Sequence, residues 1–350
     1  MRVHKPLVAI GAEEPLEDQL IMADYFHGRD GLAGIHTTHP HWSPAQTWDH
    51  LFEEPPPDDG IVSAAKDTAD LEKPPSFVPS YKPAHKEILR ILKENEPDTI
   101  TIVSVGPLTN LALAAAEDPV TFLRAQEVVS MGGAVDVDGN VTPVAEFNVF
   151  ADAIAAARVY ALTSPRPAST MPVSFKKSVL PPYPPSLPKQ LKLTLFALDL
   201  TEHHALSRGL FNEKAKDLVA AGSPLAEWMS TFMKPMFEKM ERLSVGHEGD
   251  AASLGLHDPL CIWYVLTKHS PAWVRSPQSP EDIRVETAGQ WSRGKTMRDT
   301  RTRKRRDSDG EVPHDVGNWL GRVSGNRIDR MIGSPGEDAF PRYLMERILG

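Results

Sequence analysis

Segments with the apolar pattern of β-strands alternate with segments patterned like amphipathic helices along most of this chain. The strand-like segments are short and rich in β-branched residues, and the helical ones repeat their apolar residues three and four positions apart. The pattern assigns strands to 6–12, 98–106, 127–133 and 191–201, and helices to 84–95, 106–116, 151–162 and 223–243. Such alternation is typical of βαβ units. The sequence therefore predicts an α/β fold with an open, mostly parallel sheet flanked by helices.

Two prolines fall inside the helical segments. Pro107 is expected at the first position of its helix, where the missing N–H costs nothing. Pro235 lies in the interior of the segment 223–243 and is expected to kink that helix.

Composition excludes several classes of protein. The 350 residues carry a net charge of -9 and 41% hydrophobic residues, which favours a globular protein that binds neither nucleic acid nor membrane. The single cysteine, Cys261, excludes an internal disulfide framework and a multi-cysteine zinc site. No targeting segment is recognisable, so the cytoplasm is the expected location. We expect one domain, 1–350, with Pro-rich loops at 53–83 and 178–190.

The strongest charge run is 293–306, with eight Lys or Arg residues. It allows a nucleic-acid patch, but it lacks interleaved aromatic residues. A solvated hairpin or loop is the favoured interpretation.

The carboxyl ends of the expected strands are the place to look for a ligand site. In open α/β sheets the ligand crevice lies beyond these ends. Val105–Gly106, Met131–Gly132 and Asp199 fall there, and the small residues let a ligand approach the backbone.

The segment "GNVTPVAEFN", 139–148, follows one of these ends. Pro143 opposes a helix, and in an extended segment Glu146 and Asn148 would project to the same side with Phe147 opposite. A carboxylate beside an amide is suited to bind vicinal hydroxyls. A loop whose polar groups satisfy only its own backbone is the alternative.

The segment "HDPL", 257–260, contains a second pair of polar residues. Asp258 before Pro259 is typical of a helix start, with Asp as the N-cap. The same carboxylate is also placed to meet a cation, and His257 beside it has a near-neutral pKa suited to protonating a leaving group.

Taken together, these segments resemble the inosine/uridine-preferring nucleoside hydrolase family. The resemblance rests on "VSVGPLTNLALA", "EVVSMGGAVDVDGNVTPVAEFNVFADAIAA", "LDLT" and "HDPL", in the family's order, with "HGRDGL" near the start and "DIRVETAGQWSRG" near the end. It implies a Rossmann-like core and calcium-dependent hydrolysis of the N-glycosidic bond of ribonucleosides, through an oxocarbenium-like transition state. It also implies a homodimer or homotetramer.

The resemblance implies a role for each candidate site residue. Met131, Asn140, Glu146 and Asn148 would contact the ribose. Asp258 and the backbone carbonyl of Val105 would ligate Ca²⁺, and His257 would assist the leaving base.

One part of the family's pattern has no counterpart. The family opens with a strand that ends in D-x-D-x-x-x-D-D and supplies the general base and most calcium ligands, and no acidic residues of this chain have that spacing. The first strand unit is therefore expected to be absent, and calcium, which takes six to eight oxygens, is expected to bind poorly.

Three hypotheses follow from this absence. The sequence is an incomplete version of an ordinary hydrolase whose start lies upstream, or a pseudoenzyme that binds ribose or partners an active subunit. The third is a rearranged enzyme that draws carboxylates from 53–59. An interaction scaffold without ribose binding is the non-enzyme alternative.

Overall fold

The computed structural model describes residues 5–17, 19–43, 49–54, 76–172, 180–243, 246, 248–308 and 310–350. Most of the Pro-rich loop 53–83, including the acidic residues at 58 and 59, lies outside these residues, as does the start of the loop 178–190. Neither loop interpretation is tested there.

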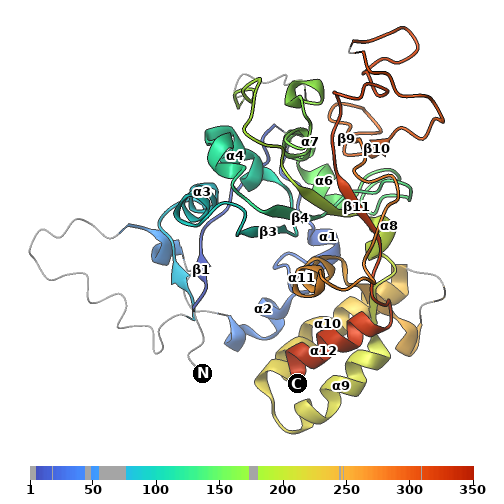
Figure 1. Ribbon diagram of the computed structural model, residues 1–350. Helices are drawn as coiled ribbons and strands as arrows, with labels where there is room; N and C mark the ends of the chain where they lie inside the picture. The colour runs from blue at the N-terminus through green and yellow to red at the C-terminus, as the bar shows by residue number, and fades with distance from the viewer. Residues whose placement is uncertain are drawn as a thin grey trace, which may run out of the picture.

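A five-stranded sheet forms the centre of the molecule (Figure 1), in the order β3, β4, β5, β11, β8. The first four strands are parallel and β8 is antiparallel to β11. Their bounds are Thr101–Ser104, Glu127–Met131, Leu193–Phe196, Asp329–Gly333 and Val274–Arg275, in the same order. This arrangement confirms the predicted mostly parallel α/β fold.

Three two-stranded pairs lie outside the main sheet. They are the parallel pair β1 (Leu7–Val8) and β2 (Val78–Pro79), and the antiparallel pairs β6 (Ala205–Ser207) with β7 (Ser253–Gly255) and β9 (Ile283–Val285) with β10 (Thr296–Arg298). The pairs with β7 and β10 join segments that the apolar pattern alone does not connect.

Helices cover both faces of the sheet (Figure 1). Alternate side chains of a strand point to opposite faces, and so Val128 packs in one core cluster while Val129 packs in the other. The first cluster includes side chains of α3, α4 and α7, and the second includes side chains of α9, α10, α11 and α12. Burial on both faces explains why β4 and β5 read as near-continuous apolar runs.

The helices follow the predicted order with shifted ends. Their bounds are α1 Asp24–His27, α2 Ile35–Thr38, α3 Ala84–Glu94, α4 Thr109–Glu117, α5 Pro119–Phe122, α6 Phe147–Ala151, α7 Ala153–Ala161, α8 Leu198–Thr201, α9 Arg208–Ala220, α10 Pro224–Leu243, α11 His257–Thr267 and α12 Ala339–Leu349. Short 3₁₀ turns lie at Pro40–Trp42, Asp49–Phe52, Pro167–Ser169 and Gly249–Ala251.

The prediction for Pro107 is wrong. Helix α4 begins at Thr109, after a cap at Leu108, so Pro107 belongs to the turn that leaves β3. Helix α10 continues through Pro235, and a kink there stays a prediction.

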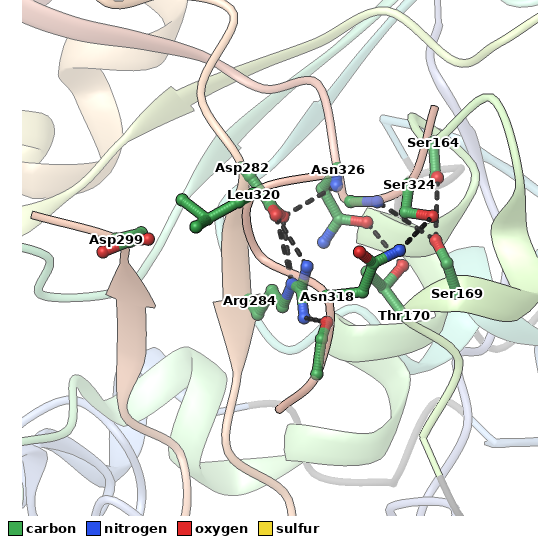
Figure 2. Close-up of polar contacts among 12 residues, drawn as sticks. Ser164, Ser169, Thr170, Asp282, Arg284, Asp299, Asn318, Leu320, Ser324 and Asn326 are labelled. Carbon is green, nitrogen blue, oxygen red and sulfur yellow. Dashed lines mark hydrogen bonds and ion pairs between the residues drawn. The ribbon is translucent and has the colours of Figure 1, made fainter. Parts of the chain in front are cut away.

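The β9–β10 hairpin is tied to the body of the molecule by polar contacts (Figure 2). The Asn326 backbone N–H donates to Asp282, its side-chain amide donates to the carbonyl of Ile283, and its amide oxygen accepts from Thr170. The Arg284 guanidinium donates to the Asp282 carboxylate. These bonds fix the hairpin that carries Thr296.

The basic run 293–306 includes β10 and the loop after it, and its interpretation as a solvated loop stays a prediction. Several of its cations have carboxylate partners: Arg298 contacts Asp136, and Arg306 contacts Asp315. No helix of the described residues is both long and apolar enough to cross a membrane. Cys261 is fully buried in α11, and burial raises the pKa of its thiol.

Candidate active site

Glu146 lies at the centre of the loop structure that follows β4. It is the N-cap of α6, only 2% exposed, and its carboxylate accepts hydrogen bonds from the backbone N–H groups of Gly133, Asn148 and Val149 at 2.8, 2.7 and 3.1 Å. The prediction of an extended segment through Asn148 is therefore wrong. Pro143 does oppose helix, but α6 begins four residues later, and Glu146 provides the cap.

The other expected ribose residues lie around Glu146. The Asn148 side-chain amide donates to the Met131 carbonyl at 3.3 Å and lies 3.2 Å from its sulfur. The Asn140 amide oxygen accepts from the backbone N–H of Phe147, the first residue of α6. Met131, Asn140, Glu146 and Asn148 thus form one connected group at the carboxyl end of β4.

The loop 132–136 is held from several directions. Gly133 has φ +82°, and a Cβ there would lie 2.9 Å from the Thr296 side chain, so glycine is required on both counts. The Thr296 hydroxyl donates to the Ala134 carbonyl at 2.7 Å and accepts from the Ala134 N–H at 2.9 Å. Sequence reasoning missed Thr296, because its partner is 162 residues away.

An ion network supports the same loop. Asp199 was expected at a strand end facing ligand, but it lies in α8, where its carboxylate accepts from the N–H groups of Val135 and Asp136 at 2.9 Å each. Arg330, 5% exposed, donates to Asp199 at 2.8 Å and also pairs with Glu281 and Asp136 at 3.0 Å. The Asp199 carboxylate thus stabilises the loop 132–136.

His257 is the first residue of α11, the helix whose buried side chains pack in the second core cluster. Its Nδ1 is 2.8 Å from the Thr201 hydroxyl, and burial lowers the pKa of the imidazole, so the ring is neutral at pH 7. A Cβ on Gly255 would lie 2.4 Å from Nε2 of this ring. The ring is therefore fixed between a hydroxyl and a glycine that leaves it room.

Asp258 is not the N-cap of α11. Leu256 occupies the cap position, and Asp258 lies in the first helical turn with no side-chain cap bond. Within the described part of the chain, its carboxyl makes no hydrogen bond to a backbone group. The residue keeps exposed surface, while packing around the carboxyl raises its pKa.

Asp258 and Val105 line the same cavity, of about 340 Å³, with apolar side chains of α11 and α12. Their role as metal ligands stays a prediction. The Asp258 charge, added to burial, raises the pKa of Glu146, which the backbone N–H bonds oppose. Asp258 is therefore close enough to the Glu146 group for its charge to act there.

The residues at this position do not fit a resident calcium ion. Calcium takes six to eight oxygen ligands, and Asp258 and the Val105 carbonyl are a fraction of that number. Within the described residues, no group of three or more His, Cys, Asp or Glu side chains is arranged to hold a metal ion. The hypothesis that 53–59 supplies carboxylates falls mainly outside the described residues.

One family model matches most of the chain. The model of the inosine-uridine preferring nucleoside hydrolase family matches residues 3–318. The chain belongs to this family. The match includes the connected group at 131–148 and the residues His257 and Asp258, so the family identified by sequence resemblance is confirmed.

Individual relatives cover different parts of this family member. An uncharacterized protein of Schizosaccharomyces pombe is 45% identical over 102 residues, 29% of this chain and 32% of that protein. The pyrimidine-specific ribonucleoside hydrolase RihA of Salmonella newport is 27% identical over 296 residues, 83% of this chain and 69% of RihA. Among solved structures, the plant nucleoside hydrolase PpNRh1 has a TM-score of 0.62 at 20% identity, covering 99% of this chain and 80% of that one, which shows the shared fold.

Proposed function

We propose that this chain binds the ribose of ribonucleosides at the group around Glu146, and that it is a ribonucleoside hydrolase whose turnover as a 350-residue chain is impaired. One observation carries the proposal: Glu146 and Asn148 are fixed side by side at the carboxyl end of β4, beside Met131. Family membership supports N-glycosidic bond hydrolysis as the reaction class.

The chemistry of the group suits a sugar. Three backbone N–H groups hold the Glu146 carboxyl in place, and Asn148 adds an amide anchored on the Met131 carbonyl. Groups fixed before binding lose little conformational freedom when they meet hydroxyls. The neutral His257 ring contacts the Thr201 hydroxyl through Nδ1. Its other nitrogen is proposed to face the leaving base and to form a hydrogen bond with it.

Impaired turnover follows from the ligand set at Asp258. Calcium would supply a bound water and contacts to the ribose hydroxyls, and the described residues offer too few oxygens to hold it. The sequence also has no match to the family's aspartate motif, which carries the general base. Loss of a general base alone slows such reactions by about 10² to 10⁴.

The first test measures ribose binding without turnover. A ribose-mimicking iminosugar at about 100 times its Kd should stabilise the chain by about 2.7 kcal/mol in thermal unfolding. Asn148→Ala should abolish this stabilisation, whereas Asn95→Ala, at the distant end of α3, should retain it. Equal stabilisation of both variants would place the sugar elsewhere.

The carboxyl of Glu146 has a test of its own. Glu146→Ala leaves three backbone N–H groups without an acceptor and should lower the free energy of unfolding by about 3 kcal/mol or more. Glu146→Gln keeps an acceptor oxygen and should lower it by less. Urea unfolding distinguishes the two variants, and equal losses would contradict the proposed hydrogen-bond role.

A second function, a ribose-binding pseudoenzyme or partner subunit, is favoured by the incomplete metal ligands among the described residues. Hydrolysis of inosine and uridine, with calcium binding measured by calorimetry, separates the two. Full turnover with micromolar calcium affinity would contradict the impairment. Iminosugar binding without turnover supports the pseudoenzyme, and no response to iminosugar leaves only the interaction scaffold.

Location and assembly stay expectations. The cytoplasm is the expected location. A homodimer or homotetramer is expected from the family, and light scattering of the purified chain tests it.

A further inference from the structure

A second cavity, which we call the β10 cavity, lies at the end of β10. Its volume is about 440 Å³, large enough for a small molecule. Polar and apolar side chains line it together, among them Met297, Arg298, Arg301, Pro313, His314 and Trp319. They come from β10 and from the part of the chain between β10 and β11, which projects from the body of the molecule (Figure 1). Among the described residues, those that line this cavity include none of the group around Glu146.

Arg301 is held in one orientation at the wall of the β10 cavity. Its Nε and Nη2 each donate to the Asp299 carboxylate at 2.8 Å, and Nη2 also donates to Asp315 at 3.2 Å. Asp315 is itself buried, and it accepts from the Arg306 guanidinium at 2.8 Å and from the Leu320 N–H at 3.0 Å. Nη1 of Arg301 has no partner within the described residues, so its N–H groups are available to a ligand.

Unpaired positive charge lies next to this arginine. The Arg303 guanidinium donates to the backbone carbonyl of His314, a residue of the lining, at 2.8 Å. Residues 303–305 are three exposed cations, and none of them contacts a carboxylate within the part of the chain that the structure describes. The acidic residue of the lining, Asp299, is already bonded to Arg301. The surroundings of Nη1 therefore favour an anion.

Another part of the lining contains an aromatic ring. The Arg284 guanidinium lies 3.8 Å from the centroid of the Trp319 ring and covers one of its faces. Because Trp319 also lines the cavity, the ring surface that Arg284 leaves uncovered is available for stacking. Met297 and Pro313 add apolar surface beside it. A flat ring suits this wall, and every nucleobase has a face that stacks on an aromatic side chain.

We propose that the β10 cavity binds a nucleoside 5′-monophosphate, with the phosphate at Nη1 of Arg301 and the base stacked on Trp319. A guanidinium of fixed orientation is suited to phosphate oxygens, and the indole ring is suited to a base. The inference does not rest on the proposed function, because the group around Glu146 takes no part in the lining.

Calorimetry with AMP tests the site. The 350-residue chain should bind AMP saturably at 1:1 with a Kd below about 1 mM. Adenosine and inorganic phosphate should each bind at least tenfold more weakly, because each makes only one of the two contacts. All three are also measured on the Asn148→Ala chain, which should bind AMP as the native chain does. No saturable binding of AMP, loss of it in Asn148→Ala, or adenosine binding as tightly as AMP would overturn the proposal.

A tryptophan pair tests the stacking. Trp319→Ala should weaken AMP binding by about fivefold or more, because it removes the platform for the base. Trp291→Ala removes a tryptophan that is 83% exposed and lies outside the lining, and it should bind AMP normally. Equal AMP binding by the two variants would overturn the proposal.

A valine pair tests the anion without disturbing the fold. Val316 lines the cavity and is 71% exposed, so Val316→Glu should leave Tm unchanged, while its carboxylate repels the phosphate and weakens AMP binding by about threefold or more. Val323→Glu, in the same part of the chain but outside the lining, should bind AMP normally. Equal binding by the two variants would remove the phosphate from the cavity and overturn the proposal.

Two further results separate this site from its alternatives. A single-stranded oligonucleotide of about ten nucleotides that bound at least tenfold more tightly than AMP would assign the surface to nucleic acid and overturn the proposal. AMP binding without iminosugar stabilisation of the same chain would remove the proposed function and keep the β10 site. Iminosugar stabilisation without AMP binding would do the opposite.

Discussion

The loop after β4 and the first turn of α11 differ in how their polar groups are satisfied. In the loop, Glu146 accepts three backbone hydrogen bonds and Asn148 is anchored on Met131. At α11, the Asp258 carboxyl makes no cap bond and lies beside an apolar cavity. The polar groups of the first region are satisfied by the fold itself, whereas the Asp258 carboxyl borders a cavity lined by apolar side chains and Arg347. The residues proposed to bind the ribose are thus held in place by backbone hydrogen bonds, whereas the carboxyl proposed as a cation ligand is not.

The largest effect is expected at the loop, through Arg330. Arg330→Ala leaves Asp199, Glu281 and Asp136 without their buried partner and should lower the free energy of unfolding by about 3–5 kcal/mol. Arg275→Ala, which removes an exposed pair with Asp329 at 3.3 Å, should cost less than about 1 kcal/mol. Urea unfolding at pH 7 measures both. Similar small losses in the two variants would mean that the loop does not depend on this network.

A smaller effect is expected at His257. Gly255→Ala places a Cβ 2.4 Å from Nε2 and should displace the ring at a cost of about 1–3 kcal/mol. A baseless iminosugar should still stabilise the variant, whereas a nucleoside analogue with a base should bind more weakly. Gly321→Ala, which places a Cβ 2.8 Å from the Asn318 side chain, is the control. Unchanged binding of both ligands would show that His257 does not contact the base of the nucleoside.

The smallest effect concerns pH and Asp258. The folded-state pKa of Asp258 is raised above 3.8, so the folded chain binds more protons than the unfolded chain between 3.8 and the raised value. Stability contributed by the protonated form is present at low pH and is lost as the pH rises through that window. Asp258→Asn should therefore gain stability relative to the native chain on going from pH 4 to pH 7. Urea midpoints at the two pH values test the sign, and an opposite trend would mean that Asp258 has a cationic partner in the folded chain.

Much of the sheet could be predicted from local pattern, because strands buried on both faces are continuous apolar runs. The segments 127–133 and 191–201 are examples, and they contain β4 and β5. Strand β11 escaped prediction. Its place beside β5 depends on the pairing of Arg330 with Leu195, far apart in sequence, and its polar start gives no strand pattern.

For the candidate site, the sequence predicts which residues lie close together but not their conformation. Glu146 and Asn148 were identified, but glutamate is not a preferred N-cap residue, so its capping of α6 was not foreseen. Asp258 shows the opposite case. Aspartate is a preferred N-cap residue, but Leu256 occupies the cap position of α11 and Asp258 lies in the first turn. In both places long-range packing, which local preference cannot represent, decides the outcome.

Because Cys261 is buried, a cysteine introduced at the cavity beside α11 can be labelled selectively. As the sole thiol of the chain, enclosed in α11 with a raised pKa, it should be inert toward maleimides in the folded state. A fluorophore attached to Leu266→Cys would then be the only dye on the protein. Its emission would report, in real time and in crude mixtures, when another molecule binds at the cavity beside α11 or leaves it.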